Sequence, residues 1–232
     1  MDAVTPLEAF LADRSSGAAE LAARALDLLE EARATLPPAR VAALARRLVA
    51  AHPAMGSIWN AAHAKDPDAF RRALERGVTD AALRARAGLP RRAKITTLSY
   101  SSTVLQTLSR RDLRVTVLES LPGGEGRRTA RLLRRRGVAV QVVEDSMAAR
   151  VVGQARFVVV GADAVTTKCI VNKVGTLSLA LAARHHGVPV IVVADRTKWV
   201  PDAWRMPERG RGTRLFEVVP RRLVTRVVSE RG

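Results

Sequence analysis

The sequence predicts an α/β protein with a mostly parallel sheet preceded by a small N-terminal helical domain. Residues 1–92 show helical spacing of apolar side chains, interrupted by Pro37, Pro38 and Pro53. Residues 93–232 instead alternate short β-branched runs with helical stretches. Strands that alternate with helices form parallel sheets that helices cover on both faces. We therefore predict two domains, a helical one at 1–92 and a ligand-binding α/β one at 93–232.

The first domain is expected to contain short helices joined by short links. Leu21, Ala25, Leu28 and Leu29 fall at helical spacing in the first of these helices. Asp66 precedes a proline and suits the cap of a later helix, because a carboxylate accepts hydrogen bonds from free backbone N–H groups. Helices are expected at 17–34, 39–51, 53–64, 67–75 and 80–87.

The second domain is expected to contain a parallel sheet with helices between its strands. Apolar, β-branched runs predict strands at 94–99, 114–119, 138–143, 157–163 and 189–195. Helical stretches between them lie at 103–110, 127–136, 146–154 and 175–186. A surface loop at 199–214 leads to two further strands, at 216–219 and 223–228. This alternation is typical of a Rossmann-like domain.

Composition excludes several classes of protein. At 47% hydrophobic residues the chain is too apolar to be disordered, yet no apolar run reaches the roughly 18–20 residues that span a bilayer. Residues 1–12 carry Asp2 and Glu8 and do not resemble a signal peptide. Cys169 is the only cysteine, so neither an internal disulfide nor a cysteine metal cluster can form. We expect a cytoplasmic protein without membrane association, metal or cofactor.

The net charge of +17 makes nucleic acid the first partner to consider. Most of the basic residues are arginines, which are spread over many amphipathic segments and accompanied by abundant alanine. This pattern is typical of a composition bias. Aromatic residues make up only 3% of the chain and leave few platforms on which bases could stack. We therefore do not expect a nucleic-acid partner.

Polar side chains gather where the predicted strands end, which is where ligands bind in open α/β sheets. Asp163 ends the apolar run 157–163, and partial burial there would raise its pKa toward that of a usable acid–base group. Lys173, in the loop expected before helix 175–186, offers a cation for a phosphate. The glycine-rich turn 122–126 opens a helix whose free N–H groups suit an anion. For each residue alone, a cap, a turn or a surface position is the competing interpretation.

An ordered series of motifs resembles one family. In chain order the motifs are Glu119-Ser-Leu-Pro122, Glu125-Gly-Arg127, Asp145-Ser146, Gly161-Ala-Asp163, Asn172-Lys-Val-Gly-Thr176 and Phe216-Glu-Val-Val-Pro220. The series resembles the α, β and δ regulatory subunits of eukaryotic initiation factor 2B, a family that includes methylthioribose-1-phosphate isomerase and ribose-1,5-bisphosphate isomerase. The resemblance covers about 94–232 and is fainter over the helical part. It implies a helical domain before a Rossmann-like domain, and a homodimer or higher homo-oligomer.

The resemblance also implies roles for individual residues. Asp163 matches the aspartate of the acid–base pair proposed for the isomerases, and Ser99 occupies the position of their catalytic cysteine. The ligand-binding positions that it implies are Arg14, Gly17, His52, Ser101, Glu125, Arg127, Asn172 and Lys173.

Several positions depart from the isomerase pattern. A serine hydroxyl is far less acidic than a thiol, and no neighbouring base is obvious beside Ser99. Glu125 stands where the isomerases have glutamine, and His52 stands where they have a phosphate-binding arginine. Leu121 replaces another arginine. Lost arginines weaken phosphate recognition, because their bidentate geometry is not easily replaced.

Three functions are therefore open. The first is binding of a small phosphorylated ligand, a sugar or a nucleotide-like compound, with little or no catalysis, because Asp163, Asn172 and Lys173 are kept but the cysteine is not. The second is an active aldose–ketose isomerase of a pentose 1-phosphate, with Asp163 as the acid–base group and Ser99 supporting it. The third is a protein-interaction module in translation.

Overall fold

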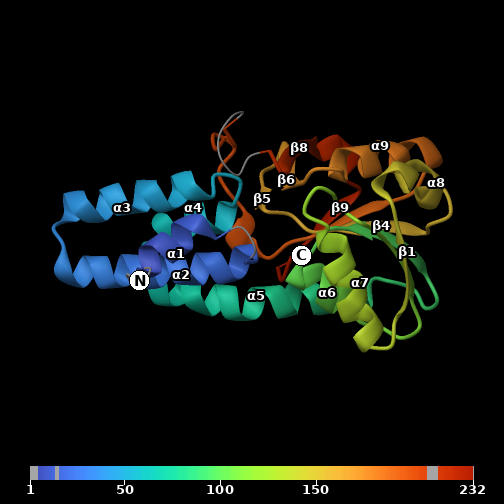
Figure 1. Cartoon of the computed structure of the whole chain (residues 1–232), viewed down its shortest axis with the longest axis horizontal. Helices are drawn as coiled ribbons and strands as arrows, with labels where there is room; N and C mark the ends of the chain where they lie inside the picture. The colour runs from blue at the N-terminus through green and yellow to red at the C-terminus, as the bar shows by residue number, and fades with distance from the viewer. Residues whose placement is uncertain (1–4, 14–15, 208–213, 232) are drawn as a thin grey trace.

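The computed structural model describes residues 5–13, 16–207 and 214–231, and it confirms the predicted fold class. Helices gather at the N-terminal side of the molecule and an α/β sheet domain lies beside them (Figure 1). The helices of the first part are α1 (Pro6–Ala12), α2 (Ala18–Thr35), α3 (Pro38–Ala51), α4 (Gly56–Ala62) and α5 (Pro67–Ala87). Across the described residues, no helix combines the length and apolar character needed to cross a membrane.

Six strands form one fully parallel sheet with the order β3-β2-β1-β4-β7-β9. When the six strands are numbered by their order along the chain, the sheet order is 3-2-1-4-5-6, which is that of the doubly wound dinucleotide-binding fold. The direction in which strands are added reverses between the first and fourth strands, β1 and β4. The strands are β1 (Lys94–Leu98), β2 (Arg114–Leu118), β3 (Ala139–Val143), β4 (Phe157–Val160), β7 (Val190–Val193) and β9 (Arg226–Val228). The predicted strand at 223–228 therefore begins later, after a short 3-10 turn, η3 (Arg221–Leu223).

Helices cover both faces of this sheet, as the alternating pattern predicts. On one face, α5, α6 and α7 pack side chains such as Ala81, Leu105 and Leu133 against Ile95 and Val115. On the other face, α8 and α9 pack against alternate residues of the same strands. The covering helices are α6 (Ser102–Leu108), α7 (Glu125–Arg135), α8 (Ala148–Val152) and α9 (Thr176–His186), with a 3-10 turn η1 (Asp145–Met147) before α8.

A second, antiparallel sheet was not predicted. It has the order β5-β6-β8, from strands β5 (Ala164–Val165), β6 (Cys169–Lys173) and β8 (Phe216–Pro220). The prediction that Asn172 and Lys173 lie in a loop is therefore wrong, because both residues belong to β6. Only three residues of β6 are apolar or small before the polar pair begins. Pairing of Asn172 with Glu217 and of Lys173 with Phe216 extends the strand beyond what its own sequence indicates.

One helix replaces the two that were predicted at 67–75 and 80–87. Helix α5 runs without a break through Gly77 and Val78, and both residues are buried. A β-carbon at Gly77 would lie 3.0 Å from the β-carbon of Asp195, so the glycine allows close packing of the helix rather than ending it. The predicted cap is confirmed, since the Asp66 carboxylate accepts a hydrogen bond from the Ala69 N–H at 2.8 Å.

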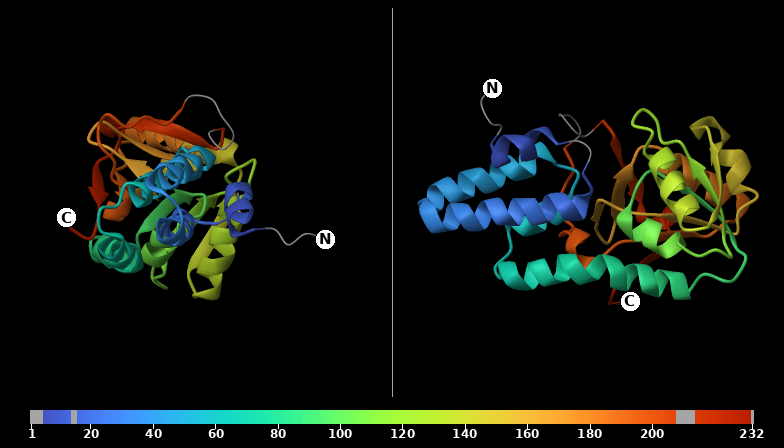
Figure 2. Two further views of the ribbon diagram at one scale, coloured as in Figure 1. Left: turned by 90° about the vertical axis from the view of Figure 1, so that its left-hand side faces the viewer. Right: turned by 60° about the horizontal axis from the view of Figure 1, so that its bottom comes forward.

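Helix α5 contributes to both parts of the molecule. Leu74 belongs to the apolar cluster of the N-terminal helices, whereas Ala81 and Ala85 belong to the core of the parallel sheet. Figure 2 shows the helix running alongside both parts. The domain boundary at 92/93 stays a prediction, and in space α5 belongs to both sides of it.

Candidate functional site

A cavity of about 140 Å³ lies where the sheet order reverses, beyond the carboxyl ends of β1 and β4. This is the expected ligand position in an open α/β sheet. The loop after β1 and the residues after β4 form one wall, the antiparallel pair of strands β6 and β8 forms another, and the N-terminal helices close the third side. The chain segments that line it include 16–19, 51–55, 99–102, 162–163, 172–173 and 215–216.

Asp163 is held rigidly by its backbone at the centre of this cavity. Its N–H donates to the Val171 carbonyl of β6 at 2.7 Å, and its carbonyl accepts from the Gly56 N–H at the start of α4 at 2.8 Å. Glycine is required at position 56 because a β-carbon there would lie 2.7 Å from the Lys198 carbonyl oxygen. The aspartate is thus fixed between the sheet and the helical part of the chain.

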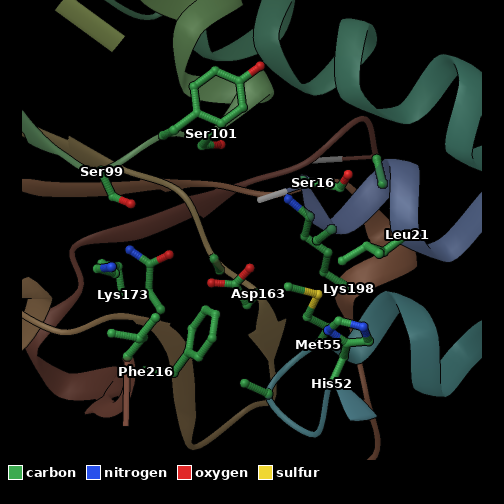
Figure 3. A pocket seen from close by; sticks show the side chains of 18 of the residues that line it. Ser16, Leu21, His52, Met55, Ser99, Ser101, Asp163, Lys173, Lys198 and Phe216 are labelled. Atoms are coloured by element: carbon green, nitrogen blue, oxygen red, sulfur yellow. The ribbon is translucent and has the colours of Figure 1, made fainter. Parts of the chain in front are cut away.

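Burial raises the pKa of Asp163 from its ordinary value of 3.8 to about 6. The charges of Lys198 and Lys173 act in the opposite direction, and Lys198 has the larger effect. Figure 3 shows the Asp163 carboxyl group in the space between these two lysine side chains. A carboxyl group with a pKa near 6 exchanges its proton close to neutral pH, as an acid–base group must.

The loop after β1 brings Ser99 and Ser101 to the same cavity. Ser99 has a left-handed backbone with φ 59°, and its N–H donates to the Ser120 hydroxyl at 2.6 Å. The Ser99 carbonyl accepts from the Thr129 hydroxyl at 2.7 Å. These contacts fix the residue, and Figure 3 shows its side chain beside the cavity. Within the described part of the chain, no side chain hydrogen-bonds the Ser99 hydroxyl, so the serine has no base to activate it.

Ser101 has a structural role as well as a place in the cavity. Its hydroxyl caps α6 by accepting a hydrogen bond from the Val104 N–H at 3.3 Å. Gly161 at the end of β4 makes room for it, since a β-carbon there would lie 2.8 Å from the Ser101 hydroxyl oxygen. The loop after β1 and the end of β4 therefore fit together at this point.

Asn172, Lys173 and Glu125 form the β6 side of the cavity. The Lys173 ammonium contacts a Glu125 carboxylate oxygen at 2.6 Å, and the lysine side chain is only 5% exposed. Asn172 is buried, and its amide nitrogen donates to the Thr176 hydroxyl at 3.0 Å. Glu125 begins α7, whose N-cap Gly124 has a left-handed backbone with φ 69°.

The helical part supplies Gly17 and His52. Gly17 is the N-cap of α2 and lines the cavity without a side chain to occupy the first N–H groups of that helix. His52 lines the cavity and is buried, and its Nε2 donates to the Phe10 carbonyl at 3.0 Å. Arg14 lies outside the described residues. The structure therefore unites most of the predicted site across both parts of the chain.

Arg127 is the predicted ligand residue that does not line the cavity. Its side chain is 66% exposed and pairs with Glu119 at 2.8 Å. The reason is its position in α7: Glu125 at the start of the helix faces the cavity, and two residues later the helix surface has turned toward solvent.

Lys198 is a cavity residue that sequence reasoning did not include among the ligand-binding positions. It ends the short turn η2 (Arg196–Lys198) after β7, and its side chain is 6% exposed. Its ammonium lies 3.5 Å from an Asp195 carboxylate oxygen. The rule that ligands lie beyond strand ends could have found it, because Asp195 and Lys198 follow the predicted strand 189–195. Among the residues that the structure describes, no group of three or more His, Cys, Asp or Glu side chains is placed to hold a metal.

The parallel sheet, with a cavity at its switch point that N-terminal helices close, makes this chain an α/β protein of the doubly wound, Rossmann-like class. The chain belongs to the initiation factor 2 subunit family, whose profile matches residues 71–205. The resemblance noted from the motifs is thereby confirmed. That family includes proteins named as initiation-factor subunits and proteins named as sugar-phosphate isomerases.

Two curated relatives illustrate both groups. A putative translation initiation factor eIF-2B subunit 2-like protein of Pyrococcus abyssi is 31% identical, over 95% of this chain and 92% of the relative. Ribose 1,5-bisphosphate isomerase of Haloterrigena turkmenica is 42% identical over 92 residues, which are 39% of this chain and 28% of the relative. Across the first curated relatives, the alignments cover between 28% and 56% of the relative's length.

Solved structures agree with the fold. Translation initiation factor eIF-2B of Pyrococcus horikoshii has a TM-score of 0.84 at 27% identity, covering 98% of this chain and 94% of that one. 5-Methylthioribose 1-phosphate isomerase from the same species has a TM-score of 0.68 at 19% identity, covering 98% and 82%, which shows the shared fold alone. A tetrameric eIF2B complex from C. thermophilum is a further structural neighbour, with a TM-score of 0.79 at 17% identity and coverage of 97% and 88%.

Proposed function

We propose that this protein binds a phosphorylated sugar in the cavity at the β1–β4 switch point and turns it over slowly or not at all. The observation that carries the proposal is Asp163, a cavity carboxyl group with a pKa of about 6 that lies under the influence of two buried lysines. Lysine ammonium groups and helix N-terminal N–H groups suit a phosphate, and a carboxyl group suits sugar hydroxyls.

The binding proposal is tested by calorimetry with ribose 5-phosphate and ribose 1,5-bisphosphate. We expect binding of at least one of them, and saturation at about 100 times the dissociation constant would add about 2.7 kcal/mol to the free energy of unfolding. Lys198→Met removes a cavity cation and is expected to weaken binding about tenfold or more. Lys168→Met is the matched control, because Lys168 is exposed and lies outside the cavity lining. Failure of the wild-type protein to bind any sugar phosphate would reject the proposal.

The serine at position 99 favours slow turnover of the proposed ligand. Proton transfer by a hydroxyl requires a neighbouring base, and the Ser99 hydroxyl has none within the described residues. We expect Ser99→Cys to create or greatly increase turnover of ribose 1,5-bisphosphate, measured by ³¹P NMR, because a thiol is the more acidic group. No gain from the cysteine would mean that catalysis is limited elsewhere in the cavity.

An active isomerase is the second candidate, and the raised pKa of Asp163 favours it. In an aldose 1-phosphate, the bond between C1 and the ring oxygen breaks, the ring oxygen gains a proton, a hydrogen moves from C2 to C1, and the C2 hydroxyl loses its proton to become the ketose carbonyl. A carboxyl group near its pKa can exchange the protons of these steps. If the wild-type protein turns the sugar over, Asp163→Asn should abolish turnover and leave binding measurable. Wild-type turnover that survives Asp163→Asn would exclude this role. Cytoplasmic location and assembly into a homodimer or larger oligomer stay predictions, the latter measurable by light scattering.

A further inference from the structure

The cavity has two ends of different electrostatic character. One end contains Lys173 and Ser99, and the other contains Lys198, His52 and Ser16 (Figure 3). Asp163 lies between the ends, and both lysines act on its pKa. Both ends present a buried lysine, but the two ammonium groups are not equally available to a ligand.

At the Lys173 end, the lysine is already paired. Its ammonium lies 2.6 Å from Glu125 Oε1, which is the distance of a strong charge-assisted hydrogen bond. The other oxygen, Glu125 Oε2, is buried and has no hydrogen-bond partner within the described residues. The carboxylate lies against Gly123, where a β-carbon would come within 2.3 Å of it. The chain is thus folded to hold a negative charge beside Lys173.

At the other end, Lys198 is paired less closely with its carboxylate partner than Lys173 is. Its ammonium lies 3.5 Å from Asp195 Oδ2, and this oxygen receives no hydrogen bond in the described structure. The second Asp195 oxygen accepts the Thr197 hydroxyl. The N-terminus of α2 begins at the same end with Gly17, which provides no side-chain cap. A loosely paired ammonium, whose carboxylate partner Asp195 does not line the cavity, and backbone N–H donors therefore gather here.

We infer that Glu125 makes the cavity selective for sugars that carry one phosphate. The phosphate binds at the Lys198 end, and the uncharged, hydroxyl-bearing part of the sugar lies toward Glu125 and Lys173. A second phosphate at the Glu125 end would meet a carboxylate that has already neutralised the nearest cation. Repulsion between like charges is strong in a partly desolvated site. This inference rests on the proposed function and names the ligand class as phosphomonoesters of sugars.

The test compares ribose 5-phosphate and ribose 1-phosphate with ribose 1,5-bisphosphate by calorimetry. We expect the wild-type protein to bind at least one monophosphate about tenfold or more tightly than the bisphosphate, which corresponds to about 1.4 kcal/mol. Glu125→Gln frees the Lys173 charge and should raise the affinity for the bisphosphate about tenfold, with a smaller effect on the monophosphates. Glu119→Gln is the matched control, because Glu119 pairs with Arg127 outside the cavity.

The outcomes separate this inference from the proposed function. Equal or tighter wild-type binding of the bisphosphate, or an unchanged ratio in Glu125→Gln, would overturn the selectivity and leave sugar-phosphate binding intact. Absence of binding to all three sugars would overturn both. Circular dichroism melting checks that Glu125→Gln is folded, and Glu125→Ala serves in its place if it is not. Equal or tighter binding of the bisphosphate by the wild-type protein overturns the selectivity even without a variant, whereas its assignment to Glu125 requires the changed ratio in the variant.

Discussion

At the scale of single residues, Asp163 shows how the fold creates chemistry that the residue type does not have. An exposed aspartate is ionised at neutral pH, whereas burial between β4 and the helical part raises the pKa of this one to about 6. Burial of a carboxylate costs free energy, and the fold bears this cost at the centre of the cavity. Buried ionisable groups with strongly shifted pKa values are typical of functional sites.

Asp163→Asn is expected to change how stability depends on pH. The folded state holds the Asp163 proton up to about pH 6, and the ordinary pKa of the group is 3.8. The free energy of unfolding of the wild-type protein should therefore fall as pH rises between these values, because the folded state binds more protons there. At pH 7.5 the asparagine variant should be about 1–3 kcal/mol more stable, the upper value corresponding to the full shift at about 1.4 kcal/mol per pH unit.

Urea denaturation at pH 4.5 and pH 7.5 checks this expectation. Asp80→Asn, on the exposed surface of α5, is the control and should leave the pH dependence unchanged. A variant at position 163 that is less stable than the wild type at pH 7.5 would show that the neighbours of the ionised carboxylate stabilise it by more than burial destabilises it.

Some residues that line the cavity could be predicted from the sequence and others could not, for physical reasons. Asp163 could be predicted because a polar residue at the end of an apolar strand has few alternatives to the sheet edge. Lys198 was not included because a lysine after a strand is usually solvated. Arg127 does not line the cavity, because a motif specifies the order of its residues and not which face of a helix each of them occupies. Its neighbour Glu125 faces inward, and Arg127 pairs with Glu119 outside the cavity.

At the scale of elements, the junction of β2 and α7 sets the position of Glu125. Gly126 lies so close to β2 that a β-carbon there would be 1.8 Å from the Leu118 carbonyl oxygen. The first turn of α7 is thereby pressed against the strand end. This close approach places Glu125 within reach of Lys173, which comes from a strand of the other sheet.

Gly126→Ala is expected to destabilise the fold by about 3 kcal/mol or more, because backbone atoms would have to move. Gly187→Ala provides a comparison, since its β-carbon would meet no atom within 4 Å and only the left-handed backbone with φ 67° opposes it. That change should cost about 1 kcal/mol. Thermal or urea unfolding of both variants measures the difference, and similar losses would mean that α7 moves away from β2 at little cost.

Elements of the parallel sheet were predictable, and elements outside it were less so. Strands such as Phe157–Val160 are buried on both faces and therefore read as continuous apolar runs. Strand β6 ends in Asn172 and Lys173, and these two residues pair only with β8, which is distant in sequence. The sequence predicts a break around Gly77, because glycine is a weak helix former. In the structure the helix continues, and Gly77 allows it to pack closely against Asp195.

At the scale of the whole molecule, Asn60 joins the helical part to the α/β part. From α4, its amide nitrogen donates to the Thr197 carbonyl at 2.7 Å and to the Trp199 carbonyl at 2.8 Å. These two residues surround Lys198 on η2. The position of a lysine that lines the cavity therefore depends on a helix about 140 residues earlier in the chain, by the sequence separation of these contacts.

Asn60→Ala is expected to lower the free energy of unfolding by about 2 kcal/mol, because two carbonyl groups lose their donors. It should also weaken sugar-phosphate binding, since η2 would no longer be held against α4. Gln154→Ala, at an exposed loop position, is the control for loss of an amide side chain. Urea unfolding and calorimetry provide the two readouts. Unaltered affinity in a destabilised variant would show that β7 alone positions Lys198.

Helix α5 has a consequence for how small molecules enter and leave. At 21 residues it is about 30 Å long, and it is embedded in the core of the N-terminal helices at one end and in the core of the sheet at the other. An uninterrupted helix anchored in this way acts as a rigid strut, so the two halves cannot swing apart as halves joined by a flexible tether do. Entry and exit of the proposed sugar phosphate would then depend on local movements of the residues that line the cavity.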